Sequence, residues 1–155
     1  MQKDNKIKIF LVDDDALFLK SLEIEFLNHA DFTIETFATG ELCLKNLSHN
    51  PDIIILDYFL DSVDKNAKNG MNILDKIKKI NPAIPVVILS SQNKIETAVD
   101  LMHHKAFYYA VKNETAFTHL QKIISSIFRD KTKGKEIEHV YGDDPIPFQL
   151  SVTNC

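Results

Sequence analysis

The sequence predicts an α/β fold, a doubly wound five-stranded parallel sheet with helices on both faces. Two runs, Ile53–Leu56 and Val86–Leu89, are wholly apolar and rich in β-branched residues, as strands buried on both faces usually are. Patterns typical of strands and of amphipathic helices alternate five times along the chain, without an internal repeat. Such regular alternation indicates parallel strands joined by right-handed helical crossovers.

The first two strand–helix units precede the central strand. Residues 7–12 are mostly apolar and run directly into three aspartates, which predicts a strand with acidic residues at its end. Apolar residues at helical spacing come next, namely Phe18, Leu19, Leu22, Phe26 and Leu27. Residues 32–37 alternate apolar and polar side chains, as a half-exposed strand does. A short helix is expected after Gly40, and Asn50-Pro51 ends it before the central strand.

The remaining units follow the central strand. Gly70 opens a helix with one apolar face, and the strand over residues 86–89 follows a turn between two prolines. The fourth helix is expected at Ile95–Met102 and the fifth strand at Phe107–Val111. The apolar side chains that line the last helix are Phe117, Leu120, Ile124, Ile127 and Phe128.

Length and composition fit one soluble domain. The 155 residues are 45% hydrophobic and 26% charged, and the net charge of -4 gives no signal for nucleic-acid or membrane binding. The helical pattern stops near residue 129, so we expect a domain over residues 6–129 and a flexible C-terminal tail over residues 130–155 without an output domain. Cys43 and Cys155 lack metal-ligand spacing, and the N-terminus lacks a signal peptide, which together predict a cytoplasmic protein.

Polar residues end four of the predicted strands: Asp13 and Asp14, Asp57, Ser90, and Lys112. Because the carboxyl ends of parallel strands open on one edge of the sheet, we expect these side chains to converge. Each also has a purely structural interpretation. The first aspartates and Asp15 are candidate helix N-caps, with Asp15 the best placed, and the others are ordinary strand-end residues. Those structural interpretations require four coincidences, whereas one shared site accounts for all of them.

The chemistry of this set is coherent. Three carboxylates in one pocket repel one another unless a cation neutralises them, and ligands that are all oxygen favour Mg²⁺. Such a cation lets an anionic carboxylate attack a phosphoryl group. Asp57 is then the candidate nucleophile, and the product is an aspartyl phosphate. Lys112 is expected to pair with the new phosphoryl charge, and Ser90 to donate a hydrogen bond to it.

With these motifs the sequence resembles the receiver domain of two-component response regulators, the flavodoxin-like (βα)5 fold of CheY-like proteins with strand order 2-1-3-4-5. The matching segments are residues 11–15, 55–57, 87–91 and 109–112, and the resemblance covers roughly residues 6–129. It implies phosphoryl transfer to Asp57 from a histidine kinase or histidine phosphotransfer protein. It also implies Mg²⁺ held by Asp13 or Asp14, Asp57 and the backbone carbonyl of Phe59.

The resemblance further implies a switch. Ser90 matches the hydroxyl residue that moves toward the phosphoryl group, and Tyr109 matches the aromatic residue that turns inward behind it. Phosphorylation would then bias the face formed by helix 4, strand 5 and helix 5, which receivers present to partner proteins. Phe59 and Gln92 occupy positions that tune dephosphorylation in receivers, which also hydrolyse their own aspartyl phosphate. Beyond this self-phosphorylation and self-dephosphorylation, no enzymatic activity is expected.

Three departures from the receiver pattern stand out. Gly70 lies thirteen positions after Asp57, farther than the corresponding glycine usually does, and Asp61 replaces a common proline. Asn113 follows Lys112 where a cis-forming proline is frequent. Lys105 precedes the fifth strand where glycine is usual, so a left-handed backbone there would be less comfortable. None of these positions belongs to the predicted phosphorylation chemistry.

Other functions fit less well. A haloacid-dehalogenase-like phosphatase needs a second aspartate two positions after the nucleophile, and here that position is Phe59. A flavodoxin-like flavin binder needs a hydroxyl- and glycine-rich loop after the first strand, where this chain has three aspartates. A pseudo-receiver that binds partners without phosphorylation remains an alternative. The prediction is therefore a stand-alone receiver that acts on an unknown downstream protein through direct contacts.

Overall fold

One parallel sheet forms the centre of the protein. The computed structural model describes residues 6–60, 70–91 and 95–133. Its five strands pair in the order β2-β1-β3-β4-β5, so the predicted fold class and strand order are confirmed. The strands are β1 (Ile7–Val12), β2 (Phe32–Phe37), β3 (Ile53–Asp57), β4 (Val86–Ser90) and β5 (Tyr108–Val111).

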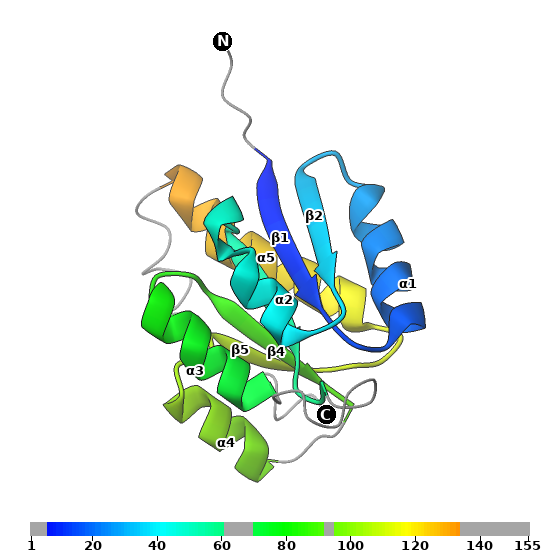
Figure 1. Cartoon of the computed structure of the whole chain (residues 1–155). Coiled ribbons are helices and arrows are strands. Elements are labelled where there is room, and N and C mark those ends of the chain that lie inside the picture. Colours follow the sequence, from blue (N-terminus) through cyan, green and yellow to red (C-terminus); the bar gives the residue numbers. More distant parts are fainter. Residues whose placement is uncertain (1–5, 61–69, 92–94, 134–155) are drawn as a thin grey trace.

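Helices cover both faces of this sheet. On one face lie α2 (Gly40–Lys45), α3 (Gly70–Ile80) and α4 (Ile95–His103), with a short 3-10 helix, η1 (Leu47–His49), after α2. On the other face lie α1 (Ala16–Leu27) and α5 (Ala116–Lys133) (Figure 1). The hydrophobic core is accordingly split by the sheet into two clusters, one under each helical layer.

The central strands are buried as their composition predicts. Every residue of β3 and β4 is buried, whereas β2 at the sheet edge is half-buried along most of its length. Leu56 of β3 pairs with Val12 of β1 and with Ile88 of β4, so the ends of three strands lie level with one another. Two of these strands end in buried polar residues, Asp57 and Ser90.

The last helix is longer than the apolar pattern indicates. Residue 129 is the predicted end of the domain, but α5 continues to Lys133. Helix propensity explains the difference, because the added segment Asp130-Lys131-Thr132-Lys133 contains no glycine or proline that would end a helix. The rest of the predicted tail, residues 134–155, lies outside the described part of the chain.

Gly70 starts α3 directly against the end of the central strand. Its backbone N–H donates a 2.7 Å hydrogen bond to the carbonyl of Tyr58. A Cβ at this position would lie 2.8 Å from both the Asp57 carbonyl oxygen and the Tyr58 Cα, closer than real Cβ atoms come to backbone. Despite its larger spacing from Asp57, Gly70 is therefore in tight contact with the end of β3. The predicted loop at 61–69, with Asp61, lies outside the described residues.

We expect Gly70→Ala to destabilise the protein by about 1–3 kcal/mol, since the atoms it would meet are backbone and cannot rotate away. Urea denaturation measures the change. Lys79→Ala is the control, because this exposed residue lies on the same helix, away from the end of β3. An equal or smaller loss at Gly70 would contradict the close-approach argument.

Lys105 has a left-handed backbone, with a φ of 75°. The N–H of Ala106 donates to the carbonyl of Leu101, and the N–H of Lys105 donates to that of Met102. This pair of bonds is the Schellman pattern that ends a helix, in which glycine is the favoured residue at the left-handed position. The strain expected from a lysine here is therefore present in the structure.

Lys105→Gly should stabilise the protein by about 0.5–1 kcal/mol, because relief of the left-handed strain exceeds the extra entropy that glycine gains on unfolding. Asn50 has a φ of 58° and supplies a control. Asparagine tolerates this conformation, so Asn50→Gly should change the free energy of unfolding much less. Loss of stability on Lys105→Gly in a urea titration would refute the prediction.

Candidate functional site

The predicted site residues gather at one edge of the sheet. Asp57 and Ser90 are the last residues of β3 and β4, Asp13 follows β1 directly, and Lys112 follows β5 directly. Oxygen atoms of Asp13, Asp14 and Asp57 all lie within 4.8 Å of one another. The parallel arrangement of the strands thus brings together residues that are up to 99 positions apart in the chain.

Lys112 lies among the carboxylates and neutralises part of their charge. Its Nζ lies 3.0 Å from Oδ1 of Asp13, 2.8 Å from Oδ2 of Asp13 and 3.6 Å from Oδ2 of Asp57. The lysine side chain is 12% exposed, and the two carboxylates are 4% and 5% exposed. One cation therefore bridges two buried anions. Lys112 is thus more buried than an ordinary lysine at a strand end.

The electrostatics of the pocket are unbalanced without a further cation. Burial, and then the negative charge of Asp13, raise the pKa of Asp57 from 3.8 to about 8, although Lys112 opposes the shift. Burial alone would lower the pKa of Lys112, but the hydrogen bond to Asp13 and the surrounding carboxylates raise it. The ammonium is thus held in its charged form, whereas the negative charge of Asp57 is only partly compensated by Lys112.

The donor set fits a hard divalent cation. Asp13, Asp14 and Asp57 supply only carboxylate oxygens, which Mg²⁺ prefers. Oδ2 of Asp13 is buried and lies beside Nζ of Lys112, but among the described residues it accepts no hydrogen bond of regular geometry. An oxygen in this state retains lone pairs for a metal ion or its bound water. These three residues are the ones that would hold the ion.

Asp15 has the structural role that its position favours. Its Oδ1 accepts 3.2 Å hydrogen bonds from the backbone N–H groups of Leu17 and Phe18, which makes it the N-cap of α1. Its own N–H donates to Oδ1 of Asp13 at 2.9 Å. The cap therefore also orients one of the buried carboxylates.

Three of the other predicted residues have defined positions in the structure. Ser90 is 1% exposed, and its carbonyl accepts a hydrogen bond from the N–H of Lys112. Tyr109 is also 1% exposed and pairs in register with Ile88. Phe59 is 38% exposed, and its ring forms a T-shaped contact with the ring of Tyr58. Gln92 lies outside the described residues.

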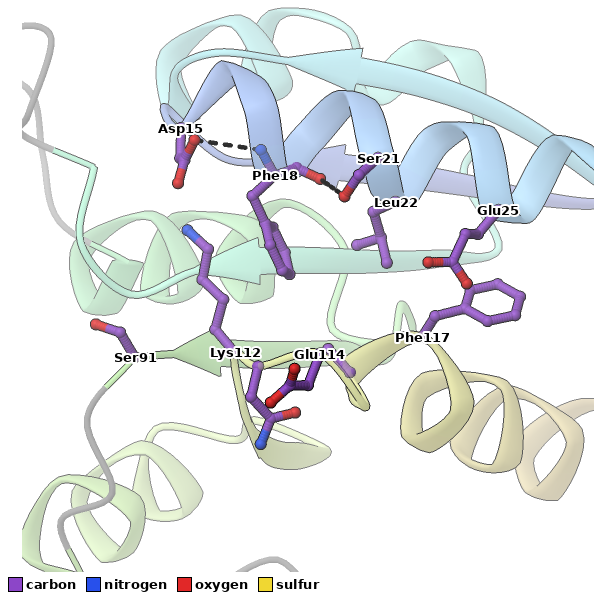
Figure 2. A pocket seen from close by; sticks show the side chains of 11 residues that line it. Asp15, Phe18, Ser21, Leu22, Glu25, Ser91, Lys112, Glu114 and Phe117 are labelled. Atoms are coloured by element: carbon purple, nitrogen blue, oxygen red, sulfur yellow. Dashed lines mark hydrogen bonds between the residues drawn. The ribbon is translucent and has the colours of Figure 1, made fainter.

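A groove of about 430 Å³ opens beside this site, between α1 and the start of α5 (Figure 2). Phe18, Leu22 and Phe117 line it together with the side chain of Lys112. The Lys112 ammonium lies over the Phe18 ring, 4.7 Å from its centroid. Helical spacing predicts that Phe18 faces the core, but it does not predict which distant cation its ring will contact.

The match to known proteins agrees with this geometry. Residues 9–125 match the family model of the response regulator receiver domain. The chain belongs to this family. This receiver is 28% identical over 123 residues to the luminescence regulatory protein LuxO of Vibrio campbellii, an alignment that covers 79% of this chain and 26% of that protein.

Two further relatives extend the comparison. The DNA-binding transcriptional regulator NtrC of Escherichia coli is 31% identical over 105 residues, which cover 67% of this receiver and 21% of that protein. A response regulator receiver domain from Clostridium thermocellum superposes with a TM-score of 0.68 at 27% identity, covering 81% of this chain and 98% of that one. The receiver thus spans about a quarter of the length of the curated relatives it matches. No helix in the described part of the chain has the length and apolar character of a membrane span.

The unbalanced pocket should make stability depend on pH. The Asp57 pKa is about 8 in the folded protein against an ordinary value of 3.8. Between these values the folded state keeps a proton that the unfolded state has lost. The contribution of this group to stability is therefore fully present below about pH 4 and is lost as the pH rises through about 8. Asp57→Asn should flatten this slope and raise the free energy of unfolding at pH 8 by about 1–3 kcal/mol.

Urea denaturation at several pH values in a chelating buffer measures both slopes. Mg²⁺ at saturating concentration provides the matched control, because it should flatten the wild-type slope without a substitution. Identical slopes for the wild type and Asp57→Asn in the chelating buffer would exclude Asp57 as the destabilising group.

Proposed function

We propose that this receiver accepts a phosphoryl group on Asp57 from the phosphohistidine of a histidine kinase or histidine phosphotransfer protein, with Mg²⁺ as its cofactor. The observation that carries the proposal is the position of Lys112, whose Nζ lies within 3.6 Å of both buried carboxylates. A buried charge arrangement of this kind has no evident use in packing, because a buried ion pair contributes little net stability. Membership of the receiver family supports the same function.

The proposed transfer is an in-line displacement. An Oδ of the Asp57 carboxylate attacks the phosphorus and the phosphorus–nitrogen bond to the histidine breaks. The imidazole leaves as a neutral ring, because the nitrogen that loses the phosphoryl group takes a proton from water. Asp13, Asp14, Asp57 and the Phe59 carbonyl would hold Mg²⁺, which would supply positive charge for the transferring oxygens. Lys112 is already beside Asp57 and needs only a small movement to pair with the phosphoryl group.

The proposed switch uses Ser90 and Tyr109. Ser90 ends the strand next to β3 and is buried at the same edge as Asp57, which suits a hydroxyl that donates to the phosphoryl group. Tyr109 lies on the adjoining strand with its side chain buried in the cluster that also contains Ala98 and Leu101 of α4. A shift of these two residues would therefore bias the α4–β5–α5 face toward a downstream protein.

The remaining expectations are part of the same proposal. The receiver dephosphorylates itself by hydrolysis, with Phe59 and Gln92 tuning the rate, and performs no other reaction. It acts in the cytoplasm through protein contacts and does not bind nucleic acid or membranes. Residues 6–129, together with the extension of α5 to Lys133, form the receiver.

Intact-mass spectrometry tests the phosphoacceptor. The wild type is incubated with Mg²⁺ and acetyl phosphate and should gain one phosphoryl group, whereas Asp57→Asn should gain none. Omission of Mg²⁺ should slow the reaction by at least about tenfold, since the carboxylate repels the anionic donor. Asp52→Asn is the control, because Asp52 precedes β3, at the opposite end of this strand from Asp57, and accepts a hydrogen bond from the backbone N–H of Lys8.

Each alternative has its own outcome in this experiment. A wild type that takes up no phosphoryl group would favour the pseudo-receiver. A phosphoryl group retained in Asp57→Asn would show that another residue is the acceptor. Sustained turnover of many unrelated phosphate esters would favour a phosphatase.

A further inference from the structure

Four contacts form a closed ring around the site. The N–H of Asp15 donates to Asp13 Oδ1, and Asp15 Oδ1 accepts from the N–H of Phe18. The Lys112 ammonium lies over the Phe18 ring, with Nζ 4.7 Å from the ring centroid. The same Nζ lies 2.8 Å from Oδ2 of Asp13, which closes the ring of contacts. The first turn of α1 is thereby connected at two points to the cation that pairs with Asp57.

Phe18 lies on the groove side of Lys112. Figure 2 shows the lysine side chain extending past the ring, with both side chains lining the groove. The ammonium therefore has carboxylates on one side and an aromatic ring on another. A cation is attracted to the face of such a ring, most strongly where water is scarce, and the Lys112 side chain is only 12% exposed.

Lysine has a long side chain with considerable rotamer freedom, which it loses when it pairs with an anion. The groove of about 430 Å³ would give the Lys112 ammonium an alternative direction, away from Asp57 and toward water. The Phe18 ring lies beside the ammonium and lines the same groove, and the Asp15 cap holds the backbone N–H of Phe18. The lysine is thus oriented before the phosphoryl group arrives.

We propose that Phe18 is a positioning residue that holds the Lys112 ammonium toward Asp57 through the face of its ring. The inference rests on the proposed function for its effect on phosphorylation, but the contact between the two side chains stands apart from it. Phe18 does not touch the phosphoryl group itself. Its effect passes through Lys112.

Fluorination of the Phe18 ring tests the electrostatic part of this role. Successive fluorine atoms weaken the negative face of the ring while its shape changes little, so packing is preserved. We expect the rate of phosphorylation by acetyl phosphate and Mg²⁺ to fall in steps, by about two- to fivefold at pentafluorophenylalanine. Phe18→Leu should lose as much, and Phe18→Tyr, which keeps the electron-rich face, should retain most of the wild-type rate.

Fluorination of Phe117 is the matched control. This ring lines the same groove, but it packs on Phe26 and His29. Its fluorination should leave the phosphorylation rate unchanged. An equal loss at both positions, or no loss at Phe18, would overturn the inference.

A second readout is independent of phosphorylation. A double-mutant cycle combines Phe18→Leu with Lys112→Met, which keeps the apolar stem of the lysine and removes its charge. In a chelating buffer the unfolding equilibrium constants should show a coupling of about two- to fivefold between the two sites. Additive effects would contradict the contact. If the cycle shows coupling but the wild type takes up no phosphoryl group, the contact between the two side chains stands and the proposed function is refuted.

Discussion

The repulsion between buried carboxylates is the constraint on which this receiver's site depends. Asp13 and Asp57 are nearly inaccessible to water, and the Lys112 ammonium compensates only part of their charge. Such an arrangement is costly in a folded protein, because ions lose their hydration when they are buried. The same imbalance favours a bound cation, which the proposed phosphoryl transfer also requires. The low stability of the pocket without a cation and the proposed chemistry therefore have one cause.

The backbone around the site tolerates this cost because it is closely packed. Gly70 brings the start of α3 against the carbonyl groups of Asp57 and Tyr58, where no side chain would fit. Asp15 caps α1 with its side chain and orients the Asp13 carboxylate with its backbone N–H. A left-handed Lys105 ends α4 before the strand that leads to Lys112. Local strain in the connections thus accompanies a rigid placement of the polar side chains.

Much of the fold followed from local pattern. Hydrophobic periodicity depends on which faces of an element are buried, so it predicts the element type. The continuous apolar runs of β3 and β4 correspond to burial on both faces. The alternation in β2 and the helical spacing in α1 and α5 correspond to burial on one face. The extension of α5 lies beyond what the apolar pattern predicts, because its last residues are polar and contain no glycine or proline. The contact between Phe18 and Lys112 is not predictable from the pattern for another reason. It joins residues on separate elements, and helical spacing specifies only that a ring is buried.

The sequence by itself determined which polar residues stand at the strand ends, and parallel topology was sufficient to make Asp13, Asp57, Ser90 and Lys112 converge. It also determined that Asp15 would cap α1, since an N-cap acts within one helical turn. Only the tertiary structure decided how the charges are shared. The depth of burial, the bridging position of Lys112 and the ring behind it depend on how α1, β3 and β5 pack together. Electrostatic energy depends on distances and solvent exposure across those elements, and neither quantity is local in the chain.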